Sequence, residues 1–305
     1  MKIDTIGVPL WEGSAFPGPE EAPKVLINAG ICQQMLKSGH SCGTCEILSP
    51  PHISEFNKND TLFYAPAVIE CCKALQNKVA HSISNGGFPL ILGGDHSLAI
   101  GSISGVNQYI PAKDLTVIWL DAHTDINTDI SSESHHIHGM PVAACLGEGD
   151  SRLIDGFGRE QKKILPGNLF YIGARSIDAG ERAILKKYNI KVYTAEEISK
   201  KGIEKVVINV LSQISTPWVH VSFDVDFIDA NQFSATGLPV PQGPSIQDTV
   251  ICLKKILSCG KISSMDFAEY NPKLDFDGQG LKVCVSLLGH CFEALNNKLQ
   301  REVYR

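Results

Sequence analysis

The sequence predicts an α/β protein with a mainly parallel sheet of about eight strands and helices on both faces. Strand-like and helix-like segments alternate from the first residues to residue 296. The strand-like segments, such as 88–92, are apolar throughout, as is typical of strands that helices cover on both sides. No repeat or linker interrupts this alternation, so we expect a single domain over residues 1–305.

The expected strands are short apolar segments bounded by polar residues, glycine or proline. They cover residues 2–7, 43–48, 88–92, 116–120, 168–172, 191–193, 218–223 and 262–267. The expected helices carry apolar residues at helical spacing, as at Val68, Cys72, Leu75 and Val79. They cover residues 23–38, 64–85, 97–109, 179–189, 196–214, 245–258 and 279–296. Long loops follow at 126–140 and 227–244, and loops of this length in a compact domain usually have a function.

Composition excludes several classes of protein. The chain has 305 residues, 43% of them hydrophobic and 20% charged, which is ordinary for a soluble globular protein. A net charge of −6 without any basic block predicts that nucleic acid is not a partner. No apolar run is long enough to span a membrane, and the N-terminal residues lack the apolar core of a signal peptide. We therefore expect a cytoplasmic protein without membrane association.

The chain contains ten cysteines. Seven lie in helical or apolar contexts, where we expect buried free thiols: Cys32, Cys71, Cys72, Cys145, Cys252, Cys284 and Cys291. Cys42 and Cys45 form a C-x-x-C without a second pair, which we interpret as part of a strand and its turn, not as a zinc or redox site. Without a secretory signal, disulfides are not expected.

The most informative segment follows the apolar run 116–120 and reads Asp121-Ala122-His123-Thr124-Asp125. In an extended strand alternate residues share a face, so the two aspartates and the histidine would point the same way. Ligands of open α/β sheets bind beyond the carboxyl ends of the strands. These three side chains are therefore candidate metal ligands.

Two other predicted strands end in similar residues, and together the three ends supply six candidate ligands: His96, Asp121, His123, Asp125, Asp224 and Asp226. Helix capping explains one isolated aspartate, but not three such sets beside buried strands, where unpaired charge is costly. Four carboxylates and two imidazoles exceed the needs of one ion and suit two hard or borderline divalent ions. No cysteine lies near them to indicate a thiolate zinc site, and manganese is the preferred metal.

These residues lie in motifs that closely resemble those of the ureohydrolase family, which includes arginases and agmatinases. The matching stretches are GGDHSLAIGS at 93–102, DAHTDINT at 121–128, HGMPVA at 138–143, SFDVDFID at 222–229, ATGLPV at 235–240 and EYNP at 269–272. Their order and spacing match as well. The similarity is firm over residues 88–272 and weaker before residue 60.

The resemblance implies two Mn²⁺ ions per subunit. Their ligands would fall into three pairs: Asp121 and Asp224 bridging the ions, His96 and Asp125 on one ion, and His123 and Asp226 on the other. A hydroxide between the ions would attack the guanidinium carbon of L-arginine and release L-ornithine and urea. Family resemblance also suggests a homo-oligomer, a trimer or a hexamer.

Three catalytic residues are expected. Glu269 matches the family position whose carboxylate faces the substrate guanidinium, and the charge-balanced metal cluster leaves that task to a separate carboxylate. His138 matches the family's catalytic histidine, and its reference pKa near 6.5 suits proton transfer. Asp125 can also accept a proton from the bridging solvent. His135 and His136 have no matched role, and we expect both to be exposed in the loop.

Four residues favour an arginase over an agmatinase, because they match positions that hold the far end of arginine. Asn127 and Ser134 match contacts to the α-carboxylate. Asp178 and Glu181, within IGARSIDAGE at 172–181, match the segment that binds the α-ammonium. Acidic residues are also favoured at a helix N-terminus, so both interpretations of this pair can hold.

Three departures from the family pattern leave alternatives open. Leu238 stands where threonine is usual, Met140 where glutamine is common, and Tyr270 where a small apolar residue is common. Leucine lacks the threonine hydroxyl, which could donate a hydrogen bond to the nearby Glu269 carboxylate. A hydrogen bond to a charged group contributes about 1.5–3 kcal/mol. A ureohydrolase acting on agmatine, guanidinobutyrate or formiminoglutamate therefore remains an alternative. So does a non-catalytic homologue, although the complete residue set argues against it.

Overall fold

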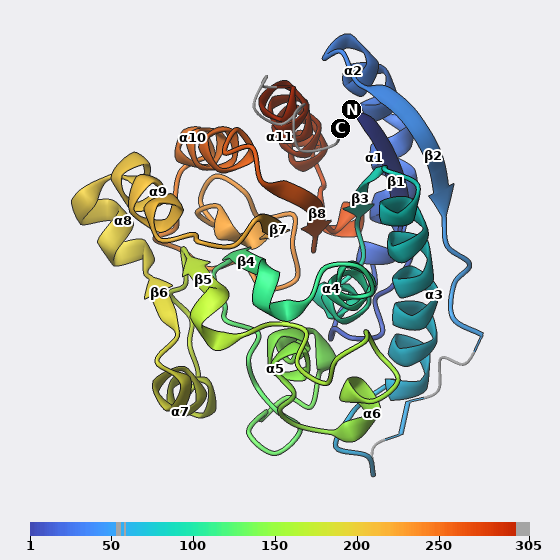
Figure 1. The fold of residues 1–305 in the computed structure, drawn as a ribbon, viewed down its shortest axis with the longest axis vertical. Coiled ribbons are helices and arrows are strands. Elements are labelled where there is room, and N and C mark those ends of the chain that lie inside the picture. The colour runs from blue at the N-terminus through green and yellow to red at the C-terminus, as the bar shows by residue number, and fades with distance from the viewer. Residues whose placement is uncertain (53–55, 58, 297–305) are drawn as a thin grey trace.

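All eight predicted strands are present and form one parallel sheet. The computed structural model describes residues 1–52, 56–57 and 59–296. The strands are β1 (Lys2–Gly7), β2 (Ser41–Ile47), β3 (Phe88–Leu92), β4 (Leu115–Leu120), β5 (Leu169–Ile172), β6 (Lys191–Tyr193), β7 (Trp218–Asp224) and β8 (Ile262–Ala268) (Figure 1). The predicted α/β class with a parallel sheet is confirmed.

The order of strands brings distant parts of the chain together. Across the sheet the order is β2-β1-β3-β8-β7-β4-β5-β6. The first three strands build one half and β4 to β6 build the other, while β7 and β8 fill the middle. The four central strands β3, β8, β7 and β4 are therefore neighbours although they are far apart in sequence. The direction in which successive strands are added reverses between β3 and β4, and open α/β sheets bind ligands at such switch points.

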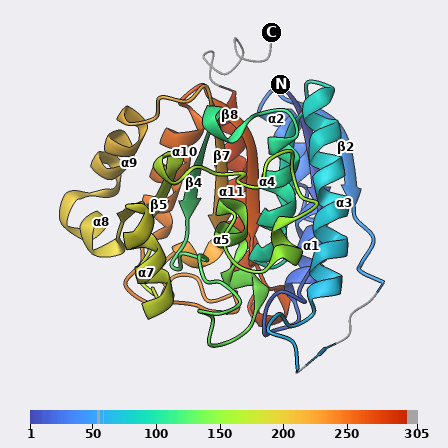
Figure 2. The same cartoon turned by 60° about the horizontal axis from the view of Figure 1, so that its bottom comes forward.

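Helices cover both faces of the sheet, as predicted. One face carries α1 (Ala22–Asn28), α2 (Ile31–Lys37), α8 (Ala195–Lys201), α9 (Ile203–Ser212), α10 (Ile246–Leu257) and α11 (Gln279–Leu295). The other carries α3 (Ala65–Ser84), α4 (Ala99–Asn107), α5 (Pro141–Leu146), α6 (Ser151–Ile154) and α7 (Ala179–Tyr188). Figure 1 shows α10 and α11 on one side of the central strands and α4 and α5 on the other, and Figure 2 shows α5 in front of the sheet.

Each face of the sheet has its own hydrophobic core, and β4 contributes side chains to both. Ile118 and Leu120 pack into the core beneath α9 to α11, whereas Val117 and Trp119 pack into the core beneath α3 to α5. Alternate residues of a strand point to opposite faces. A strand buried on both sides must therefore be apolar at every position, which explains the uninterrupted apolar runs of the sequence.

Helix boundaries differ from the prediction in three places. The predicted helix 23–38 is divided into α1 and α2, because Gly30 between them adopts a φ of 89°. Gly202, with a φ of 84°, likewise divides the predicted helix 196–214 into α8 and α9. The sequence did not predict α5 and α6, whose six and four residues are too short to show a helical period.

Six of the seven cysteines predicted to be buried are buried, but Cys32 is partly exposed. This prediction was wrong because Cys32 lies on α2, which packs against the largely exposed edge strand β2. Cys42 and Cys45 both lie inside β2 and are exposed. Within the described part of the chain, no helix combines the length and the apolar character needed to cross a membrane.

Candidate active site

The carboxyl ends of the four central strands meet at one edge of the sheet. Leu120 at the end of β4 pairs with Phe223 of β7, and Phe223 pairs with Phe267 of β8. Phe267 in turn pairs with Leu92 at the end of β3. The residues that follow these four positions therefore start from neighbouring points, and they include every predicted metal ligand and Glu269.

The turn after β3 places His96. Gly93 and Gly94 have φ values of 72° and 79°, and a Cβ on Gly94 would lie 2.7 Å from the carbonyl oxygen of Val8. Only glycine tolerates both constraints without strain. The ring of His96 stacks on Trp119 with centroids 4.1 Å apart, and its Nε2 pairs with Ser222 Oγ at 2.8 Å. These contacts leave Nδ1 directed toward the carboxylates.

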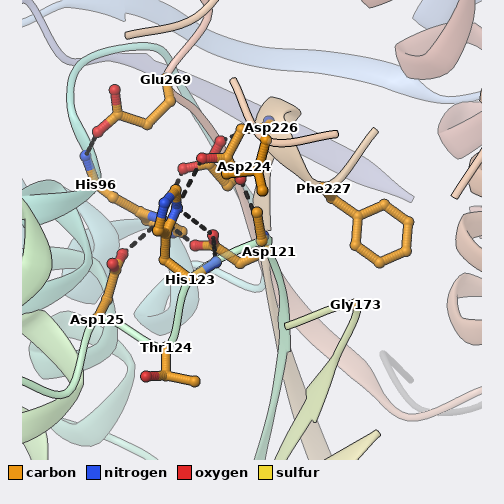
Figure 3. Close-up of polar contacts among 12 residues, drawn as sticks. His96, Asp121, His123, Thr124, Asp125, Gly173, Asp224, Asp226, Phe227 and Glu269 are labelled. Carbon is orange, nitrogen blue, oxygen red and sulfur yellow. Dashed lines mark hydrogen bonds and ion pairs between the residues drawn. The ribbon is translucent and has the colours of Figure 1, made fainter. Parts of the chain in front are cut away.

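The two predicted imidazole ligands contact the four predicted carboxylates (Figure 3). His96 Nδ1 lies 3.1 Å from Asp121, 3.2 Å from Asp125 and 3.3 Å from Asp224, and His123 Nδ1 lies 2.9 Å from Asp226 and 3.5 Å from Asp121. Asp121 thus stands between two groups of ligands. The six residues that the sequence singled out come together as one cluster.

The donor set fits metal ions. Ligand atoms of His96, Asp121 and Asp224 all lie within 4.8 Å of one another, and so do those of Asp121, His123 and Asp226. His96 Nδ1 is buried and makes no hydrogen bond of normal geometry with any residue that the structure describes. Carboxylate oxygens with imidazole nitrogens suit hard or borderline divalent ions. Asp121 belongs to both groups, so the residues present would fit two divalent ions held side by side.

The backbone path of the ligands differs from the prediction. The sequence predicted that Asp121, His123 and Asp125 share a face because the strand continues, but β4 ends at Leu120. Asp125 instead turns with a φ of 46°, and Asp226 lies in a 3₁₀ turn, Val225–Phe227. Turns allow the side chains to converge on one point, whereas an extended strand would spread them over about 13 Å. The predicted convergence is confirmed, but the predicted reason for it was wrong.

Hydrogen bonds hold these carboxylates in position. Trp119 Nε1 donates to Asp121 Oδ2 at 2.9 Å, and the backbone N–H of His123 donates to Asp121 Oδ1 at 2.6 Å. The N–H of Ala122 donates to Asp226 Oδ1 at 3.0 Å. Hydrogen bonds from β4 and from the turn after it thus orient the candidate ligand cluster.

The electrostatics of the cluster also favour a cation. Burial and the neighbouring charge of Asp121 raise the pKa of Asp125 to about 7. Burial together with Asp226 and Asp121 raises the pKa of Asp224 well above its usual range. For Asp121, burial opposes ionisation, but the two imidazoles outweigh it and hold its pKa low. Buried carboxylates so close together repel one another when they are all ionised. Bound divalent cations would offset this repulsion.

Glu269 and His138 form a pair beside the ligands. Glu269 follows β8 with a φ of 66°, and its Oε1 accepts hydrogen bonds from His96 N at 2.8 Å and from His138 Nδ1 at 3.2 Å. Burial opposes protonation of His138, but the Glu269 carboxylate outweighs it and raises the pKa of His138 to about 9. Non-glycine residues with a left-handed backbone, as at Glu269, often occur at functional sites.

One cavity of about 100 Å³ gathers most of the predicted site. Ten predicted residues line it: His123, Asp125, Asn127, Ser134, His138, Asp178, Glu181, Asp224, Asp226 and Glu269. The other two predicted residues, His96 and Asp121, lie buried beneath it. The departure Leu238 also lines the cavity and is 43% exposed.

The residues predicted to bind the far end of the substrate form a connected group. Asn127 Nδ2 donates to Asp178 Oδ2 at 3.0 Å, and the N–H of Asp178 donates to Glu181 Oε2 at 2.8 Å. The N–H of Ile126 donates to Glu181 Oε1 at 3.3 Å. Glu181 therefore ties the start of α7 to the loop after β4, as expected for an acidic residue at a helix N-terminus. Ser134 lies exposed at the rim of the same cavity.

Two features of this site were not predicted from the sequence. Thr236 lines the cavity with a buried hydroxyl that has no hydrogen-bond partner in the described structure. Its place in the motif at 235–240 was the available signal. The loop near Gly13 accepts a hydrogen bond from His138 N at 2.9 Å, and Gly13 N donates to Asp95 at 2.9 Å. No motif in the sequence indicated that this N-terminal loop supports His138.

One prediction in this loop was wrong. His135 and His136 were expected to be exposed, but both are half-buried against Phe63, with ring centroids 5.4 and 5.6 Å away. Phe63 precedes α3 and is remote in sequence, so the loop alone could not indicate this contact.

The fold and site together define a class: an α/β protein with a candidate metal centre at the carboxyl ends of the central strands of a parallel sheet. Residues 1–292 match the arginase family. The chain belongs to this family, whose members are hydrolases acting on a C–N bond of linear amidines.

Individual relatives support this assignment over nearly the full length. The arginase of Brevibacillus brevis is 36% identical over 295 residues, which cover 95% of this chain and 97% of the relative. The crystal structure of arginase from Bacillus subtilis superposes with a TM-score of 0.87 at 34% identity, covering 98% and 99% of the two chains. Arginase from Entamoeba histolytica, solved in complex with L-ornithine, has a TM-score of 0.87 at 29% identity, with coverage of 95% and 97%.

Proposed function

We propose that the chain hydrolyses L-arginine to L-ornithine and urea with two manganese ions as cofactor. The observation that carries the proposal is the meeting of six metal-type ligands, Glu269 and His138 around one small cavity. Two divalent ions, when bound, supply an activated water nucleophile at neutral pH and stabilise the developing negative charge. The L-ornithine complex of the Entamoeba histolytica relative supports the substrate assignment.

The residues around the ions would divide the remaining work. The two hydrogen bonds from His96 N and His138 Nδ1 both go to Glu269 Oε1, so we assign Oε2 to the cationic guanidinium. His138, paired with Glu269 through Nδ1, would carry a proton and release it to the leaving amine. Asp125, whose pKa is raised to about 7, would accept a proton from the attacking water.

The far end of the substrate would meet the connected group at the rim. Asn127 and Ser134 would contact the α-carboxylate, and Asp178 and Glu181 would face the α-ammonium. Support comes from their common position in the lining of the cavity. The carboxylates of Asp178 and Glu181 provide the negative charge that an ammonium group needs.

A panel of substrates tests this function. Metal-free protein is loaded with manganese, and urea and the amine product are measured from arginine, agmatine, guanidinobutyrate and formiminoglutamate. We expect arginine to be preferred, with two ions counted per subunit by metal analysis. Preference for agmatine would overturn the substrate and leave the hydrolase class intact. No turnover of any of these compounds would favour a non-catalytic homologue.

Three further properties belong to the same proposal. We expect the whole chain to form one domain, because all the described strands lie in one sheet. We also expect a homo-oligomer, a trimer or a hexamer, which light scattering can measure. A cytoplasmic location is expected, and cell fractionation can test it.

A further inference from the structure

Three cysteines gather at the outer edge of the sheet, away from the candidate active site. Cys32 lies on α2, and Cys42 and Cys45 lie on the edge strand β2. The Sγ atoms of Cys32 and Cys45 are 3.6 Å apart. Both cysteines of β2 are exposed and Cys32 is partly exposed, so small molecules in solvent reach this pair.

A β-bulge explains why both cysteines of β2 face α2. In a regular strand, residues three apart point to opposite faces. Here Cys42 pairs with Ile3 and Cys45 pairs with Thr5, so two residues of β2 oppose Asp4 alone. The extra residue brings both thiols to one side of the strand. This is the side of Ile3, which packs into the same core as Ile31 and Met35 of α2.

The bulge is fixed by specific contacts beneath it. Asp4 Oδ1 accepts hydrogen bonds from Thr44 N at 2.7 Å and Thr44 Oγ1 at 3.1 Å, while Asp4 Oδ2 accepts one from Ser82 Oγ at 2.7 Å. A Cβ on Gly43 would lie 2.0 Å from Asp4 Oδ1. Asp4 therefore requires glycine between the cysteines and holds Thr44 in place. The backbone of the bulge, and not the choice of side-chain rotamer, therefore places the two cysteines of β2 on the same side of the strand.

Six of the other seven cysteines are buried, and Cys259 is partly exposed. The buried ones are Cys71, Cys72, Cys145, Cys252, Cys284 and Cys291. Burial also raises the pKa of Cys32 and Cys42, and neighbouring cysteine contributes to both shifts. These two groups are therefore thiols at neutral pH, and their reaction as thiolates becomes faster as the pH rises.

We propose that Cys32 and Cys45 form a reversible disulfide by exchange with small-molecule disulfides of the glutathione class. The exposed Cys45 thiolate attacks one sulfur of the external disulfide, which releases one small thiol and leaves a mixed disulfide on Cys45. The Cys32 thiolate then attacks Cys45 Sγ and releases the second small thiol. Two protein thiols are oxidised, and one external disulfide is reduced to two thiols.

The geometry suits this step. The two Sγ atoms must approach from 3.6 Å to about 2.0 Å, which small rotations of surface side chains supply. The bond would tie α2 to β2 and so brace the edge strand. Edge strands expose unpaired backbone groups, and bracing one limits its pairing with other chains. The edge strand β2 is separated from β3 by β1, so the cysteines lie outside the candidate active site.

Peptide mapping of the full-length protein tests the proposal. The reduced protein is incubated with mixtures of reduced and oxidised glutathione, quenched with acid, alkylated and digested. Mass spectrometry should find Cys32 linked to Cys45 as the dominant cross-link in the wild type. Cys42→Ser should retain this cross-link, whereas Cys45→Ser and Cys32→Ser should lose it. The alkylated peptide with Cys71 and Cys72 serves as the internal control for buried thiols.

Two results would overturn the proposal. One is a dominant Cys42–Cys45 cross-link that persists in Cys32→Ser. The other is the accumulation of mixed disulfides with glutathione and no internal cross-link at any ratio. Circular dichroism of each serine variant checks that it is folded. If Cys32→Ser does not fold, the comparison of Cys42→Ser with Cys45→Ser decides the question alone.

Discussion

The floor and the rim of the candidate active site are built in different ways. The floor contains His96 and Asp121, which are 0% and 1% exposed and follow β3 and β4, the outer two of the four central strands. The rim contains Ser134 and Leu238, which are exposed and lie in the long loops. The register of the sheet determines where the floor residues lie, whereas the loops determine the rim. We therefore expect the metal chemistry to be common to the family and the substrate preference to depend on this chain's own loops.

The largest effect is expected from a change in the floor. Asp226→Ala removes a carboxylate 2.9 Å from His123 Nδ1, so it should remove one ion and lower activity by about a thousandfold or more. Metal analysis and urea release measure the two effects. Asp155→Ala, which changes an exposed aspartate outside the cavity, is the matched control. Two bound ions and full activity in the Asp226 variant would contradict the ligand assignment.

Removing the metal should destabilise the floor in a way that depends on pH. The pKa of Asp125 is raised from 3.8 to about 7, so between these values the folded metal-free protein binds more protons than the unfolded chain. Its free energy of unfolding should therefore fall as the pH rises from about 4 to about 7. The raised pKa of His96 and of His123 acts in the same direction at higher pH.

Thermal unfolding of metal-free and metal-loaded protein across this range measures the effect. The gap between the two midpoints should widen as the pH rises. Asp125→Asn, which cannot ionise, should show a smaller pH dependence of the metal-free midpoint than the wild type. If the difference between the two unfolding midpoints did not change with pH, ionisation of Asp125 would not be what destabilises the metal-free protein.

A smaller effect is expected where floor and rim meet. Glu269→Gln removes the charge that raises the pKa of His138, so this pKa should fall from about 9 toward 6.5. The ion pair's contribution to the free energy of unfolding is complete below about pH 6.5 and is lost as the pH rises through about 9. NMR titration of His138 in metal-free protein measures the pKa. An unchanged pKa would show that Glu269 does not control this histidine.

At the rim, Asp178→Ala should mainly raise the KM for arginine, by about tenfold, because a charged contact to the α-ammonium at an exposed position is lost. The arginine analogue without an α-ammonium group is the control, and its KM should not change between wild type and variant. Equal changes for both compounds would place Asp178 in a structural role, as the partner of Asn127.

The smallest effect is expected from Leu238→Thr, which restores the hydroxyl usual in the family. Leu238 is 43% exposed and lines the cavity, so the change should fold normally and raise kcat/KM for arginine up to about tenfold. Leu238→Val is the control for side-chain volume. A gain for agmatine and none for arginine would show that Leu238 belongs to a different substrate preference.

Sequence patterns sufficed to predict the strands, and to single out the polar side chains that cluster at their ends, for one physical reason. A strand covered on both faces must be apolar throughout, and a buried carboxylate at its end must have a partner. The eight apolar runs and the residues after them therefore carried the information locally. Helices divided at Gly30 and Gly202 show the limit, because one glycine breaks a helix without breaking its apolar period.

By itself the sequence determined the class of fold, the six candidate ligand residues and the resemblance of their motifs to a family. Only the tertiary structure decided how those ligands meet: through turns at Asp125 and Asp226, not through a continued strand. It also decided that His138 rests on the loop near Gly13, and that a bulge at Gly43 turns two cysteines toward a third. Contacts between residues far apart in the chain depend on strand order and register, and no local pattern encodes these.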